Sequence, residues 1–250
     1  MALAYVQGKM GQANGVTSVA ITFNTTPGAG SLIVAGFYAV ASGSPTFAAT
    51  CADNKGNTYT DADQFTSGAG GDRVGIGGFY AMNVSSSATF TVTISNLPSG
   101  AVTAFIAEVS GAHLTAALDV AIAQDEASTL NPTTASTGVL AQAAEIVFAL
   151  TGTYPSFQSG GIMTCNTSGY TQIFEHVAPN TNTYGVGEAD YRIVAATTAQ
   201  QVDWTTDYSS NDFGTLIMAF KEAAGGAASP TGNTLYSKVL RSLTQGRVIG

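Results

Sequence analysis

Four blocks of this sequence occur twice in the same order, about 110 residues apart, and this duplication is the strongest constraint on its fold. CADNKGNTYTDADQF at 51–65 resembles CNTSGYTQIFEHV at 165–177, because both run from Cys through a polar turn to Gly and Tyr. The other pairs are SLIVAGFYAV (31–40) with AEIVFALTGT (144–153), VGIGGFY (74–80) with YGVGEADY (184–191), and TAFIAEV (103–109) with GTLIMAF (214–220). Matched blocks in one order indicate a duplicated supersecondary unit.

Period-two patterns predict strands within these blocks. Apolar and polar residues alternate at 90–95 and 19–23, which is typical of half-buried strands. Residues 32–40, 146–150 and 216–220 are apolar on both alternating faces, so we expect both faces to be covered, inside the fold or by a neighbouring subunit.

Glycines and turn residues mark the boundaries of the strands. Gly75, Gly77, Gly185 and Gly187 leave one face of two matched strands bare, and we expect an aromatic ring or backbone to pack there. Residues 53–57 and 166–169 have the composition of tight turns that need positive φ.

We therefore predict an all-β fold: an antiparallel, jelly-roll-like β-sandwich with internal duplication, followed by an extended C-terminal arm. The body covers residues 1–222, with half-repeats at about 16–110 and 131–222. Two small sandwiches in tandem are the alternative. The segment from 111 to 140 joins the halves, and we expect a short helical turn at 116–123.

The last residues differ in composition from the body. Residues 223–234 are a linker of mainly small residues, and 235–250 are basic with apolar residues at helical spacing, which predicts an amphipathic arm. The arm residues expected to contact a partner are Leu235, Tyr236, Lys238, Val239, Leu240, Arg241, Leu243 and Arg247.

Charge excludes several classes of partner. The net charge is −8, and eight Lys and Arg residues are too few for a nucleic-acid-binding surface. Up to Glu222, sixteen acidic and five basic residues give −11, whereas the remaining residues carry +3.

No apolar run is long enough to span a membrane, and the first residues lack the pattern of a Sec signal.

Cysteines and histidines suggest no cofactor. Cys51 and Cys165 lie at matching points of the repeat, so they could form a disulfide, although free thiols are the simpler interpretation. His113 and His176 have neither zinc-ligand spacing nor a catalytic context, and we expect no metal and no catalytic residue.

Paired carboxylates are the residues that glycoside hydrolysis would require. Glu188 and Asp190 share a strand face beside Arg192, and we expect them, like Asp61 and Asp63, to be solvated. Glu108 interrupts an apolar strand; a solvent-facing or interface position is favoured over a buried one. Trp204 is expected in the core, and Tyr184, Tyr191 and Tyr208 could form a glycan-stacking platform.

Over residues 16–222, the composition, the GNTYT turn and the duplicated blocks resemble the Thr/Gly/Ser-rich β-sandwich modules of tailed-phage virion proteins and bacterial surface proteins. This resemblance implies a structural or adhesive role without catalysis. Because no secretion signal precedes the module, we expect export inside a particle: a phage capsid-decoration, head-fibre or tail-associated protein located in the virion. A glycan-binding adhesin or receptor-binding module is the alternative, and a polysaccharide hydrolase is third.

The expected partners are sister subunits, with a trimer favoured, and other virion proteins such as the major capsid protein. Surface glycans are possible partners, whereas nucleic acid and membrane are not expected.

Overall fold

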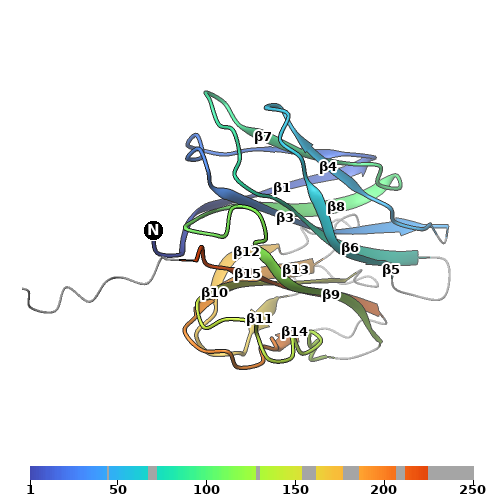
Figure 1. The fold of residues 1–250 in the computed structure, drawn as a ribbon. Helices are drawn as coiled ribbons and strands as arrows, with labels where there is room; N and C mark the ends of the chain where they lie inside the picture. Colours follow the sequence, from blue (N-terminus) through green and yellow to red (C-terminus); the bar gives the residue numbers. More distant parts are fainter. Residues whose placement is uncertain are drawn as a thin grey trace, which may run out of the picture.

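The computed structural model describes residues 1–43, 45–66, 72–127, 130–153, 162–176, 186–206 and 212–224. Every regular element in this part of the chain is a β-strand, and the strands pair antiparallel (Figure 1). The all-β prediction is therefore confirmed, whereas the linker from residue 225 and the arm lie outside the described residues.

The strands fall into two sets, which we call repeat 1 and repeat 2. Repeat 1 contains β1 (Ala4–Val16), β2 (Val19–Thr22), β3 (Leu32–Ser42), β4 (Thr50–Asp53), β5 (Thr60–Thr66), β6 (Asp72–Ala81), β7 (Thr91–Ser95) and β8 (Gly100–Ser110). Repeat 2 contains β9 (Leu118–Ala127), β10 (Glu145–Thr153), β11 (Met163–Cys165), β12 (Thr171–His176), β13 (Val186–Val194), β14 (Trp204–Thr206) and β15 (Asp212–Lys221).

Each repeat has a five-stranded sheet and a smaller outer sheet. The five-stranded sheets have the orders β1-β8-β3-β6-β5 and β9-β15-β10-β13-β12, and the outer sheets are β2-β7-β4 and β14-β11. A bridge between Thr133 and Asp203 occupies the place in repeat 2 that the β2–β7 pairing has in repeat 1. The two repeats therefore share one topology, in which β9 corresponds to β1, so both begin earlier in the chain than the predicted half-repeats.

Three apolar cores separate four layers of sheet. The outer core of repeat 1 lies between its two sheets, the outer core of repeat 2 lies between β11-β14 and its five-stranded sheet, and a central core joins the two five-stranded sheets. Figure 1 shows repeat 1 above repeat 2 in this sandwich-like stack. The strands that are apolar on both faces, β3, β10 and β15, are covered within the fold itself.

The two repeats also share irregularities in their strand pairing. In repeat 1, β1 has an extra residue between Tyr5 and Gln7 where it pairs with β8. In repeat 2, β9 has an extra residue, Asp119, at the equivalent position of its pairing with β15. The β5–β6 pair has a second irregularity at Ala62, and the β12–β13 pair has its equivalent at Ile173. Bulges are specific features of a fold, so two shared bulges indicate one unit present twice.

The pairing also corrects the alignment of two blocks, because Gly75 and Gly77 of β6 align with Val186 and Glu188 of β13. Gly36 lies opposite Gly78 and Leu150 lies opposite Ala189, so β3 aligns with β10 at an offset of 114 when β6 and β13 are aligned at 111. The match of 31–40 with 144–153 is therefore one residue out of register. Such a slip exchanges the two faces of a strand, and both faces of β3 and β10 are apolar, so hydrophobicity alone could not reveal it.

Close packing explains the alternating glycines. A Cβ on Gly75 would collide with the Phe47 ring, and a Cβ on Gly152 or Gly187 would collide with the Tyr38 ring. Tyr38 belongs to the central core. Its ring, from repeat 1, therefore packs on the part of the repeat 2 sheet where Gly152 and Gly187 have no side chain. The expected packing of rings against these glycines is confirmed where the structure describes them.

Local predictions mostly hold. Gly56 and Gly169 adopt φ values of 78° and 85°, and the Asp53 carboxylate accepts hydrogen bonds from the backbone N–H groups of Lys55 and Asn57. The helical turn expected at 116–123 is wrong, because this segment enters β9 and pairs with β15.

Candidate functional site

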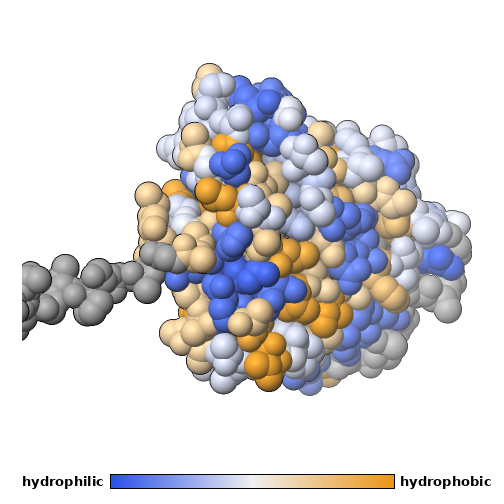
Figure 2. All heavy atoms as spheres, viewed as in Figure 1, coloured by the Kyte–Doolittle hydropathy of each residue, from blue (hydrophilic) through white to orange (hydrophobic). Residues whose placement is uncertain are grey.

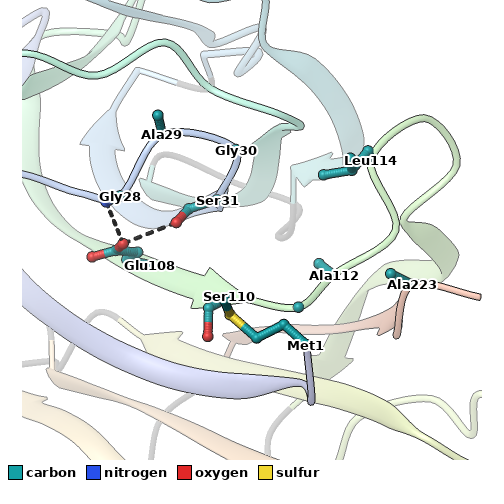
Figure 3. Close-up of a pocket in the computed structure, with 11 residues that line it drawn as sticks. Met1, Gly28, Ala29, Gly30, Ser31, Glu108, Ser110, Ala112, Leu114 and Ala223 are labelled. Carbon is teal, nitrogen blue, oxygen red and sulfur yellow. Dashed lines mark hydrogen bonds between the residues drawn. The ribbon is translucent and has the colours of Figure 1, made fainter. Parts of the chain in front are cut away.

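The candidate site is a pocket of about 370 Å³ at the end of the molecule where β8 ends. Four segments form it: the first residue, the loop before β3, the end of β8 with the turn after it, and the residue that follows the β15 region (Figure 3). Its lining consists of Met1, Gly28, Ala29, Gly30, Ser31, Glu108, Ser110, Gly111, Ala112, Leu114 and Ala223. Most of these residues are small or apolar, and Glu108 is the one acid among them.

Glu108 is held by three neutral donors. Its Oε1 accepts hydrogen bonds from the Gly28 N–H at 2.7 Å and the Ser31 hydroxyl at 2.9 Å, and its Oε2 accepts one from Gln7 Nε2 at 2.7 Å. The side chain is only 3 % exposed. Glu108 is therefore buried, and the expectation that it faces solvent is wrong, since its donors come from two distant segments that fold over it.

The loop before β3 is shaped to meet this carboxylate. Gly30 has a φ of 83°, and the Ser31 N–H donates to the Gly28 carbonyl, which turns the chain toward β8. A Cβ on Gly28 would lie 3.3 Å from Ser31 Oγ and 3.5 Å from Glu108 Oε1, so any larger residue there would crowd the hydrogen bonds.

The rim of the pocket is apolar and open to solvent. Met1 and Leu114 are 87 % and 49 % exposed. Figure 2 shows weakly hydrophobic residues on the side of the molecule where Figure 1 marks the N-terminus. An apolar rim above a buried anion with neutral partners is suited to a group that combines apolar surface with a positive charge.

A second polar cluster lies inside repeat 2. Glu188 and Asp190 on β13 are 2 % and 1 % exposed and face the small outer sheet. Asp190 Oδ2 accepts a hydrogen bond from Trp204 Nε1 at 2.9 Å, and Glu188 Oε1 accepts one from Gln172 Nε2 at 3.0 Å. The expectation that these acids are solvated is wrong, whereas the prediction that Trp204 is in the core is confirmed.

Burial raises the pKa of both acids, and for Glu188 the neighbouring Asp190 carboxylate raises it further. Protonated Glu188 can donate to Asp190 and so remove one charge from the core. Repeat 1 has Gly77 and Phe79 at the aligned positions. The acid pair is therefore specific to repeat 2. Its carboxylates are enclosed, whereas the carboxylates of a catalytic dyad must be accessible to the substrate.

Glu145 is a fourth buried acid. It is completely buried, accepts a hydrogen bond from the Gln142 N–H, and lies opposite Lys221 in the sheet. Desolvation raises the pKa of Glu145 to about 7. In the corrected alignment it occupies the place of Ser31, so the two repeats have different polar groups at the same end of the sheet.

The predicted glycan platform is only partly described. Tyr191 is half-buried, and its ring stacks on Tyr5 of β1 at a centroid distance of 4.0 Å. One of its faces is therefore covered by the other repeat. Tyr184 and Tyr208 lie outside the described residues, as do the arm residues from Leu235 to Arg247.

The two cysteines are free and belong to different cores. Cys51 packs against the outer core of repeat 1 and Cys165 against that of repeat 2. Two five-stranded sheets lie between them, and stacked sheets are about 10 Å apart, well beyond disulfide reach. A disulfide between Cys51 and Cys165 of one chain is therefore excluded.

The remaining candidates have local roles or no described partner. His113 Nδ1 accepts hydrogen bonds from the backbone N–H groups of Thr115 and Ala116, which closes a turn. Among the described residues, no three His, Cys, Asp or Glu side chains gather as metal ligands, and no helix long and apolar enough to cross a bilayer is present.

Sequence reasoning missed the pocket almost entirely. Glu108 was singled out, but Gly28, Ser31, Ser110 and Leu114 were not, and Pro27-Gly28 with Gly30 was the one local signal of a turn there. Comparison with known proteins adds no assignment, because no family model, curated protein or solved structure matches this chain.

Proposed function

We propose that this chain is a non-enzymatic structural protein of a virus particle, a phage capsid-decoration, head-fibre or tail-associated component. The observation that carries the proposal is the stack of two equivalent two-sheet units joined through a continuous apolar core. Such a block presents its two small outer sheets on opposite sides, which suits a structural element of a larger assembly.

The strand pairing supports a jelly-roll description of each repeat. When a long antiparallel ribbon of eight strands rolls up, the first strand pairs with the eighth, the second with the seventh and the third with the sixth. In repeat 1, β1 pairs with β8, β2 with β7 and β3 with β6. Jelly rolls are common in viral capsid proteins, and this analogy of fold raises the virion proposal above the alternatives.

The buried acids support a structural role over hydrolysis. Glu108 is bound by a loop, Asp190 is bound by Trp204, and both are almost fully enclosed. Each holds two segments together. The glycan-binding alternative has less support, because Tyr5 covers one face of the Tyr191 ring and that face cannot stack on a sugar.

Assembly through the C-terminal arm is part of the proposal. The arm carries +3 and the body −11, so attraction favours encounter with another body and weakens as salt increases. The partners would be sister subunits in a trimer and the major capsid protein, and the protein would leave its host inside the particle.

Particle association tests the proposal. In an induced lysate of the strain that encodes the chain, particles purified on a density gradient should contain it at a fixed ratio to the major capsid protein, measured by quantitative mass spectrometry. Deleting residues 225–250 should release it from these fractions. Recovery of the full-length chain only in soluble fractions would refute the virion role, and micromolar binding on a glycan array that Tyr191→Ala abolishes would favour the adhesin.

A further inference from the structure

The pocket combines a buried carboxylate with exposed apolar side chains. Glu108 brings a negative charge to its wall, and the three groups that bind the carboxylate are all neutral. Buried charges are normally paired with an opposite charge. Leu114 and Met1 add exposed apolar surface beside it, and no described residue supplies an oppositely charged hydrogen-bond donor to Glu108 or covers this surface.

The C-terminal segment of the same sequence has both complementary properties. Residues 235–250 contain an apolar stripe at helical spacing and three cations, Lys238, Arg241 and Arg247. Ala223, the first residue of the linker, forms part of the lining. In the sequence, residues 224–234 separate Ala223 from Leu235, and a Gly/Ser-rich chain of this length has an average end-to-end distance of roughly 17–20 Å.

We propose that the pocket receives residues 235–250 of a neighbouring copy, with the apolar stripe over Leu114 and Met1 and a Lys or Arg side chain directed toward Glu108. This inference rests on the assembly part of the proposed function and identifies the acceptor surface. It places the contact at the end of repeat 1, where Figure 3 shows Leu114, Ala112 and Ala223 around the same opening.

A second copy is the favoured occupant because of where the segment starts. To enter its own pocket, the segment would have to reverse within residues 224–234 and cover its own starting point at Ala223. A segment from another copy approaches without this reversal. Each copy has one pocket and one C-terminal segment, so copies that exchange their segments can form a closed, small oligomer. Once the first contact has formed, the remaining contacts form at high effective concentration.

A matched pair of substitutions tests the pocket in the full-length protein. Leu114 lines the pocket and is 49 % exposed, whereas Leu130 does not line it and is 50 % exposed. By sedimentation equilibrium, Leu114→Asp should raise the dissociation constant of the oligomer at least tenfold, and Leu130→Asp should change it less than twofold. Equal effects of the two substitutions, or none, would overturn the proposal.

The charged contact has its own test. Replacing Lys238, Arg241 and Arg247 with Gln should weaken the oligomer at least tenfold at low salt and remove most of its salt dependence. Glu108→Gln should do the same, with circular dichroism used to confirm that the sheets remain folded. Salt dependence that survives all these changes would exclude the pairing with Glu108.

Isotope-mixed cross-linking identifies the occupant. A photoreactive residue at position 240, in a mixture of ¹⁵N-labelled and unlabelled full-length protein, should cross-link to peptides containing residues 28–31 or 111–114, with both isotopic combinations present. Cross-links confined to one isotope would show docking on the same chain and overturn the proposal, as would cross-links to any other surface. Because these experiments use purified protein, they are independent of particle association: an oligomer without particle binding would refute only the virion role.

Discussion

At the scale of single residues, the repeats differ most in their buried acids. Glu108 is bound by groups from two distant segments, whereas Glu188 and Asp190 lie side by side in the outer core of repeat 2. Burial is the main cause of the raised pKa values of the latter pair. Their protonation state therefore matters for stability.

We predict that Glu188→Gln makes the protein more stable at pH 9 and leaves its stability nearly unchanged at pH 5. The folded-state pKa of Glu188 is raised from 4.5 to about 8, so the folded protein binds more protons than the unfolded one between these values. Wild-type stability falls with pH there, by up to about 1.4 kcal/mol per pH unit. Gln cannot ionise, so this pH dependence is removed in the variant.

Urea denaturation at several pH values measures this effect. Glu126→Gln is a suitable control, because Glu126 lies on an edge strand and its pKa is also raised by burial, but without a pair in the core. A Glu188→Gln variant that loses stability equally at both pH values would show that the charged form is needed.

At the scale of elements, the contact between Tyr38 of β3 and the glycines of β10 and β13 controls how closely the repeats approach. Gly152→Ala should destabilise the protein by about 1–3 kcal/mol, as overpacking of a core does, because its Cβ meets the Tyr38 ring. In a Tyr38→Leu background the same substitution should cost clearly less. Thermal denaturation of the four proteins of this double-mutant cycle measures the coupling, and additive losses would show that the ring is not the obstacle.

The sequence predicted those elements whose pattern depends on local burial. Alternation at 19–23 and 90–95 gave β2 and β7, and apolar runs gave β3, β10 and β15. The Ala-rich segment at 116–123 has a helical composition, but pairing with β15 overrides this propensity. The pocket could not be predicted, because Gln7 and Gly28 reach Glu108 across 101 and 80 residues of sequence.

At the scale of the whole molecule, the central core connects the two repeats along the full width of their larger sheets. Residues of both repeats contribute its aromatic contacts, including Phe105 with Phe148 and Tyr80 with Phe220. Separating the repeats would expose this surface to water, so neither should unfold alone.

We therefore predict a single cooperative unfolding transition. Trp204, the one tryptophan, lies in the outer core of repeat 2, so its fluorescence reports on that repeat, whereas far-UV circular dichroism reports on all strands. The two midpoints in guanidinium should coincide. A fluorescence midpoint displaced by more than the fitting error would mean that repeat 2 unfolds separately.

The equivalence of the two faces that form the central core has a consequence for the origin of the chain. A polypeptide with a single unit would present the same apolar face on every copy, and two such faces fit each other in a symmetric, isologous dimer. Joining two units through the segment after β8 makes that association independent of concentration. It also lets each half change without its twin: one acquired an acid-walled opening at its end, and the other enclosed a pair of acids. Fusion of the two subunits of such a homodimer would produce this arrangement: two halves with the same bulges and the same central contact that differ in their polar chemistry.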